Sequence, residues 1–156
     1  MTVEPVLLRL LVVAGIVLAA GVAGRLWQAR DGRVRVSADP ADPGSPRLTE
    51  AELEAVGLAA HPTGPQALLL GSPTCAPCVT VRRVLDEVRA ARPELTWAYV
   101  DAADHLDLAD AHAVRRVPTL FVLDIDGTIL ARTSGVPRTD DLVAVLDGRD
   151  ELTPAA

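Results

Sequence analysis

The stretch SPTCAPCVT, residues 72–80, contains both cysteines of this 156-residue chain. Just before it, residues 66–70 (QALLL) form a short apolar run, which predicts a central strand buried on both faces. After it, residues 78–92 repeat apolar side chains at helical spacing, at Val81, Val84, Leu85 and Val88. Cys75 and Cys78 are therefore expected where a buried strand passes into a helix, with Cys75 at the start of that helix.

This position predicts redox chemistry for Cys75. Unpaired N–H groups and the helix dipole at a helix N-terminus stabilise a thiolate, which is the species that attacks a disulfide. Cys78 lies one turn further on, close enough to bond back to Cys75, and Pro77 presets the backbone of that turn. A C-x-x-C pair at this point of a β-α unit favours a redox role, whereas a pair in a loop between two strands would suggest a metal.

The rest of the composition excludes several classes of protein. Two cysteines are too few for a disulfide-stapled scaffold or a closed structural zinc site. The histidines have no metal-ligand spacing to the pair; they are His61, His105 and His112. We therefore expect no metal and no cofactor. The net charge is −6 and no run of like charge is long enough for a nucleic-acid arm.

The sequence around the cysteines predicts alternating helices and strands. Thr49 followed by Glu52 is a capping box at the start of a helix over residues 49–58. Asp126-Gly127 is a strong turn signal inside a hairpin that spans residues 118–133. The remaining elements are a strand over residues 95–102, a helix over 105–114 and a capped helix over 139–148. This order implies an α/β fold, with a mixed sheet of four or five strands flanked by helices.

From residue 66 to residue 148 the chain resembles the thioredoxin family. The specific parts of the resemblance are the Cys75-Ala-Pro-Cys78 pair after the apolar strand and the Val117-Pro118-Thr119 sequence that enters the hairpin. Weaker parts, in the family's order and spacing, are Val100-Asp101, Arg116, Asp126-Gly127 and Gly135. The resemblance implies a thioredoxin-like fold and no cofactor.

The resemblance also implies roles for individual residues. Cys75 would attack a substrate disulfide, and Cys78 would resolve the resulting mixed disulfide. Pro118 would be a cis-proline that faces the pair. The substrate would bind along the backbone beside this proline and on the surface around the cysteines, which assigns substrate binding to Val117, Pro118, Thr74, Ala76 and Pro77.

Four positions depart from the pattern of thioredoxin itself. Thr74 replaces the tryptophan before the first cysteine, and Arg83 replaces the proline that kinks the helix. Leu69 replaces the buried aspartate six residues before that cysteine, and Trp97 replaces its lysine partner. The acid that helps to move a proton at the resolving cysteine is therefore missing, which suggests slow turnover, a dedicated partner, or proton transfer by water.

The N-terminal segment predicts a membrane anchor. Residues 6–24 contain a single charge, Arg9, and as a helix would span roughly 28 Å, about the thickness of a bilayer core. A cleaved signal peptide and a buried core helix are the alternatives. Four arginines follow the segment, Arg25, Arg30, Arg33 and Arg35. The positive-inside rule then places the following domain in the cytoplasm, with the extracytoplasmic side as the alternative.

The predicted organisation is an anchor over residues 1–29, a Pro/Gly-containing tether over 30–47, a thioredoxin-like domain over 48–149 and a tail over 150–156. The function that we expect is a membrane-attached thiol–disulfide oxidoreductase that reduces protein disulfides and receives electrons from an upstream donor. Two alternatives remain: a module that binds or delivers a soft metal such as copper, and a non-catalytic interaction domain of the same fold.

Overall fold

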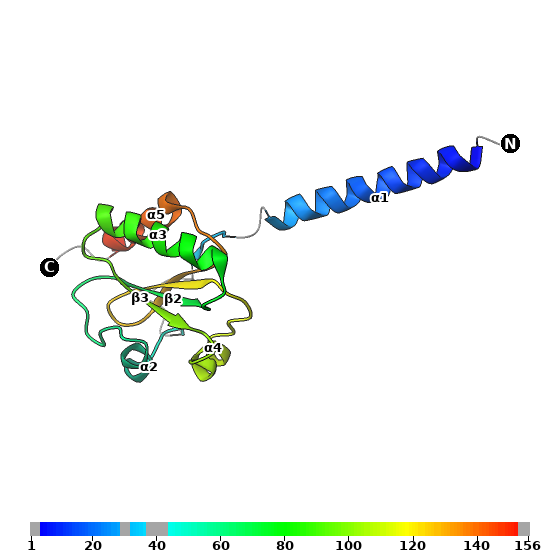
Figure 1. The fold of residues 1–156 in the computed structure, drawn as a ribbon. Coiled ribbons are helices and arrows are strands. Elements are labelled where there is room, and N and C mark those ends of the chain that lie inside the picture. Colours follow the sequence, from blue (N-terminus) through cyan, green and yellow to red (C-terminus); the bar gives the residue numbers. More distant parts are fainter. Residues whose placement is uncertain (1–3, 29–31, 37–43, 153–156) are drawn as a thin grey trace. The chain divides into compact units, whose positions relative to one another are not determined.

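The computed structural model describes residues 4–28, 32–36 and 44–152 of the chain. Two units are distinguished, Met1–Asp31 and Gly32–Ala156. The first unit contains one helix, α1 (Glu4–Gln28), and the second contains the sheet with its flanking helices (Figure 1). Of the predicted tether, residues 32–36 and 44–47 are described, and residues 30–31 and 37–43 lie outside the described ranges.

Helix α1 covers the segment that the sequence predicts as an anchor. From Arg9 to Arg25 every side chain is exposed, and Leu18 reaches 72%. Among the helices of the described ranges, none is both long and apolar enough to cross a membrane. The membrane anchor therefore stays a prediction.

A five-stranded mixed sheet forms the centre of the second unit, in the order β1-β5-β4-β2-β3. The strands are β1 (Arg35–Val36), β2 (Gln66–Gly71), β3 (Thr96–Asp101), β4 (Thr119–Leu123) and β5 (Ile129–Ser134). Strands β2 and β3 run parallel, and all other neighbouring pairs are antiparallel. Every residue of β2 is buried, which confirms a strand covered on both faces.

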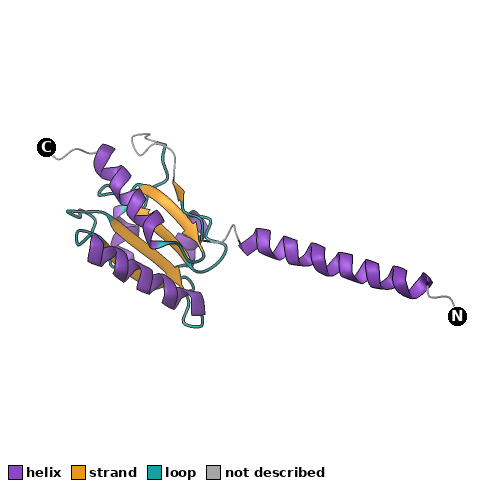
Figure 2. Cartoon of the chain, turned by 90° about the horizontal axis from the view of Figure 1, so that it is seen from above, coloured by secondary structure: helices purple, strands orange, loops and turns teal. Residues whose placement is uncertain are grey.

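Helices pack on both faces of this sheet (Figures 1 and 2). One face carries α3 (Ala76–Ala91) and α5 (Thr139–Leu152), and the other carries α2 (Glu50–Ala55) and α4 (Leu106–Ala111). Successive side chains of a strand point to opposite faces. Leu69 of β2 accordingly packs in the core under α3 and α5, whereas Leu68 and Leu70 pack in the core on the side of α2 and α4.

Short-range signals placed most of the elements, but three helix ends differ from the prediction. Helix α2 ends at Ala55 and not at residue 58. Helix α4 ends at Ala111, because Ala113 takes a positive φ of 49° and turns the chain toward β4. Helix α5 runs on to Leu152, beyond the predicted end. Its first residue, Thr139, donates a hydrogen bond from Oγ1 to Glu87 Oε2 of α3 at 3.0 Å and so links the two helices.

The hairpin turn forms where Asp126-Gly127 predicts it. Gly127 has a φ of 79°, and a Cβ there would lie 2.5 Å from the backbone oxygen of Leu48. The N–H of Thr128 donates to Asp126 Oδ1 at 3.0 Å. Only glycine satisfies both the conformation and the close approach, so the sequence signal has a clear structural cause.

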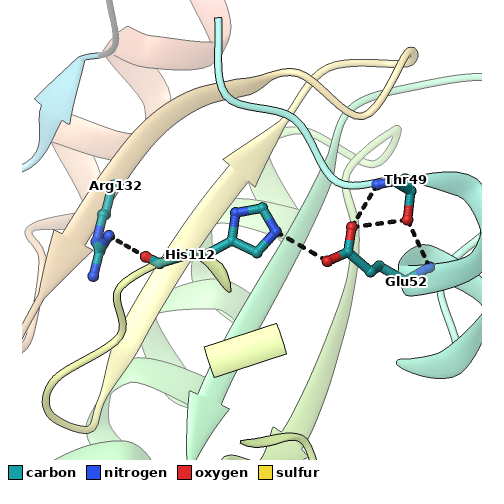
Figure 3. Close-up of polar contacts among 4 residues, drawn as sticks. All are labelled: Thr49, Glu52, His112 and Arg132. Atoms are coloured by element: carbon teal, nitrogen blue, oxygen red, sulfur yellow. Dashed lines mark hydrogen bonds and ion pairs between the residues drawn. The ribbon is translucent and has the colours of Figure 1, made fainter. Parts of the chain in front are cut away.

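The predicted capping box of α2 also forms, and it extends to a second helix. The Thr49 N–H donates to Glu52 Oε2 at 2.7 Å, and the Glu52 N–H donates to Thr49 Oγ1 at 3.2 Å. The other carboxylate oxygen of Glu52 lies 3.3 Å from His112 Nε2, at the end of α4 (Figure 3). Burial raises the pKa of Glu52, but the contacts with Thr49 and His112 outweigh it and lower the pKa overall.

The lowered pKa of Glu52 gives a pH-dependent contribution to stability. Such a group stabilises the fold above its unfolded-state pKa, and the contribution is lost as the pH falls through its folded-state pKa. We expect Glu52→Gln to lower the free energy of unfolding by about 1 kcal/mol at pH 7. We expect the difference from wild type to shrink below about pH 4.

Urea denaturation between pH 3 and pH 7 measures this effect. The control is Glu54→Gln, which changes an exposed carboxylate on the same helix. A difference for Glu52→Gln that stays the same at pH 3 and pH 7 would contradict the assignment.

Candidate functional site

Cys75 and Cys78 are joined by a disulfide, with an S–S distance of 2.06 Å and a Cα–Cα distance of 5.4 Å. Cys75 is the N-cap residue of α3, and Cys78 lies in its first turn. The Cys78 N–H donates to the Cys75 carbonyl oxygen at 3.1 Å. Cys75 is partly exposed, whereas Cys78 is only 3% exposed. A partner molecule therefore has access to Cys75 and not to Cys78.

The start of α3 is an electropositive environment for a thiolate at Cys75. The first turn carries no acidic side chain, and Pro77 occupies one of its first two positions. Unpaired N–H groups at this end favour a negative charge. These are the features that stabilise the attacking form of a cysteine.

The peptide bond between Val117 and Pro118 is cis, as the resemblance to the thioredoxin family implies. In the antiparallel pairing of β2 with β4, Leu70 lies opposite Thr119. The end of β2, which leads to the cysteines, and the start of β4, which follows Pro118, therefore lie at the same edge of the sheet. The Gly135 N–H donates to the Pro118 carbonyl oxygen at 2.9 Å and ties this segment to β5.

The residues predicted to contact a substrate differ in exposure. Thr74, Ala76 and Pro77 are exposed around Cys75. Val117 is partly exposed and Pro118 is buried. Of Val117 and Pro118, Val117 is thus the residue whose side chain a substrate can reach.

Leu69 and Trp97, the two apolar replacements, lie in the core under α3. Leu69 is fully buried, and it packs in the same core as Trp97. The indole N–H of Trp97 is buried and has no hydrogen-bond partner. At the two positions where thioredoxin has its aspartate and lysine, this core therefore contains the apolar side chains of Leu69 and Trp97.

The structure brings forward two residues that the sequence analysis missed, Gly71 and Tyr99. A Cβ built on Gly71 would lie 2.4 Å from Tyr99 Cε2, 3.0 Å from Cys78 Sγ and 3.1 Å from Tyr99 Oη. The missing side chain at Gly71 therefore lets the tyrosine ring approach the buried cysteine. Alternation along β3 puts Tyr99 on the same face as Trp97, which was the only signal in the sequence.

Arg82 contacts this tyrosine from α3. Its guanidinium carbon lies 5.1 Å from the centroid of the Tyr99 ring, a cation–π distance. From the sequence alone, Arg82 and Arg83 indicate a solvated helix face, with steering of an acidic partner or a small anionic thiol as the alternative. Because residues four apart share one side of a helix, Arg82 follows Cys78 on the same face of α3.

No protein-family model and no curated protein sequence matches the chain. Among solved structures, chloroplastic thioredoxin z superposes with a TM-score of 0.53 and 20% identity over 67% of this chain and 92% of its own. Thioredoxin-2 of the malaria parasite gives a TM-score of 0.49 and 22% identity, over 54% of this chain and 82% of its own. Mitochondrial thioredoxin 3 of Saccharomyces cerevisiae gives 0.47 and 19%, over 54% and 77%. The match to thioredoxin z shows a thioredoxin-like fold.

Proposed function

We propose that this protein is a thiol–disulfide oxidoreductase that reduces disulfides of protein substrates. The observation that carries the proposal is the position of the disulfide, which joins a partly exposed Cys75 at the start of α3 to a buried Cys78. The thioredoxin-like fold and the C-x-x-C pair support the same class of chemistry.

In the proposed reaction the reduced protein attacks through Cys75. The Cys75 thiolate bonds to one sulfur of the substrate disulfide, and the other substrate sulfur leaves as a thiolate. Cys78 then attacks Cys75 and re-forms the disulfide, and the second substrate sulfur leaves with the electron pair. The protein is oxidised, the substrate is reduced by two electrons, and an upstream dithiol donor must restore the pair.

Substrate binding is assigned to the surface around Cys75. Thr74, Ala76 and Pro77 are exposed next to the partly exposed Cys75 in the chain. We assign the backbone at Val117 and Pro118 to holding an extended substrate segment, as the resemblance to thioredoxins implies.

Trapping of a mixed disulfide tests this proposal. We expect Cys78→Ser to accumulate a covalent complex with disulfide-containing proteins that dithiothreitol releases, because no thiol remains to resolve it. Cys75→Ser is the matched control and should trap nothing. Loss of bound Cu(I) in both variants, with trapping in neither, would overturn the proposal in favour of a metal module. No trapping and no metal would favour an interaction domain.

We also propose that α1 attaches the protein to a membrane, with the domain on the cytoplasmic side. The uninterrupted exposure of apolar side chains from Leu10 to Val22 supports attachment, and Arg25, Arg33 and Arg35 support the orientation. Fractionation of cells that carry a C-terminally tagged chain, followed by protease treatment of intact spheroplasts, tests both. A protected tag in the membrane fraction is expected. A digested tag would overturn the orientation, and a tag in the soluble fraction would overturn the attachment.

A further inference from the structure

Cys78 must lose a proton before it can attack, and its surroundings oppose that loss. The side chain is 3% exposed and belongs to the buried face of α3, whose Val81 packs in the same apolar core as Leu69. A thiol in an apolar environment resists ionisation. Among the described residues, the buried polar side chains are hydroxyls and one amide, at Ser45, Gln66, Thr119, Thr128 and Thr133. None of them is a carboxylate. The nearest carboxylate in the strand register is that of Asp101, opposite Gly71; it is partly exposed and accepts a hydrogen bond from the Ala103 N–H at 2.9 Å.

Tyr99 brings a hydroxyl close to this thiol. One point in space, the Cβ position of Gly71, lies 3.0 Å from Cys78 Sγ and 3.1 Å from Tyr99 Oη. The two atoms are therefore no farther apart than the sum of these distances, a separation that one hydrogen-bonded water spans. Tyr99 is partly exposed, so its hydroxyl connects the buried sulfur with solvent.

Arg82 adds a positive charge beside the ring of Tyr99. Its guanidinium lies over the Tyr99 ring at 5.1 Å, on the helix that carries Cys78. A cation beside the ring holds the ring in place, and it favours negative charge that forms on the sulfur or the phenol oxygen during proton transfer.

We propose that Tyr99 relays the proton of Cys78 to solvent in the resolution step, in place of a buried carboxylate. This inference rests on the proposed disulfide exchange and concerns its second half only. Gly71 permits the approach, Tyr99 carries the hydroxyl, and Arg82 positions the ring.

The relay couples loss of the Cys78 proton to the attack of Cys78 on Cys75. The Cys78 proton moves, through one water, to the Tyr99 oxygen while the proton of that hydroxyl passes to solvent. The Cys78 thiolate attacks Cys75, the Cys75–Cys78 bond forms, and the bond from Cys75 to the substrate sulfur breaks. The substrate sulfur leaves with the electron pair and takes a proton from solvent.

Reaction of the reduced full-length chain with 5,5′-dithiobis(2-nitrobenzoate) separates the two halves of the exchange. The chain has only two cysteines, so every thionitrobenzoate released comes from this site. Attack by Cys75 releases the first equivalent at a rate that depends on reagent concentration. Attack by Cys78 on the mixed disulfide releases the second at a rate that does not.

Tyr99→Phe keeps the ring and removes the hydroxyl. We expect it to slow the second phase roughly tenfold at pH 7, because the proton of Cys78 then has no relay to solvent. The first phase should not change. The difference should vanish above about pH 10, where a thiol ionises without help. Trp97→Phe is the matched control on the same face of β3 and should leave both phases unchanged.

Three results would overturn the relay. An unchanged second phase in Tyr99→Phe at every pH would show that the hydroxyl does not act. Slowing by one factor at all pH values would show a packing role instead of proton transfer. Wild-type protein that releases a first but no second equivalent would overturn the exchange function itself, and the relay with it, whereas the first two results leave that function standing.

Discussion

Replacing Cys75 with serine is expected to lower the catalysed reduction of insulin disulfides by dithiothreitol to the uncatalysed rate. Cys75 is the cysteine that a partner can reach, since Cys78 is 3% exposed. A serine hydroxyl stays protonated at neutral pH and does not exchange with disulfides, whereas a thiolate does. Serine has a similar size and is a favoured N-cap residue, whereas Cys75 makes no side-chain cap hydrogen bond, so the start of α3 is not weakened and the loss reports chemistry.

The comparison with Cys78→Ser separates the effect of losing the nucleophile from the effect of losing the disulfide. Both variants lack the Cys75–Cys78 bond, so an effect of the missing cross-link appears in both. Only Cys78→Ser should still consume one equivalent of a disulfide reagent. Thr80→Ser, an exposed hydroxyl change in α3, should keep the wild-type rate. Catalysis retained in Cys75→Ser and lost in Cys78→Ser would reverse the two roles.

The fold follows closely from local patterns in the sequence. Residues 66–70 predict a strand covered on both faces, and β2 is that strand. The Thr49–Glu52 capping box and the Asp126-Gly127 turn both form, because each signal depends on contacts between residues only a few positions apart. The end of α4 was missed because the positive φ of Ala113 accompanies a long-range contact: Arg132 Nη2 donates to the Ala113 carbonyl oxygen at 2.8 Å.

Of the candidate site, only the cysteines and the cis-proline could be predicted before the structure was known. Spacing alone placed Cys75 at a helix start, and the family resemblance implied the cis bond before Pro118. Tyr99 was not predictable, because its approach to Cys78 depends on the register of β2 with β3, in which Leu69 lies opposite Tyr99. A sequence pattern gives the face of a residue on a strand but not its neighbour across the sheet.

Replacing Phe121 with alanine is expected to cost about 3–5 kcal/mol of the free energy of unfolding. Phe121 is fully buried at the centre of the core on the α2 and α4 side of the sheet. The ring of His112 meets it edge-on at 5.8 Å, and the guanidinium of Arg132 lies over it at 5.3 Å. Domains of this size are stable by about 5–15 kcal/mol, so the variant would lose a large share of its stability.

The loss of stability depends on the contacts of the Phe121 ring with His112 and Arg132 as well as on the cavity that alanine would leave. Arg132 is partly buried, and burial followed by repulsion from Arg35 lowers its pKa. Its charge is compensated by a hydrogen bond to the carbonyl oxygen of His112 at 2.7 Å (Figure 3) and by another to that of Ala113 at 2.8 Å. Removing the ring takes away the cation–π contact as well and leaves His112 beside an empty space.

Urea denaturation at pH 7 measures the change, with Phe121→Leu and Ile125→Ala as comparisons. Leucine keeps most of the apolar volume but loses both ring contacts, so its loss should lie between those of wild type and alanine. Ile125 is 42% exposed, and its replacement should have little effect. Equal losses for leucine and alanine would mean that the ring contacts with His112 and Arg132 carry the stability. A loss below about 1 kcal/mol for alanine would contradict the packing of this core.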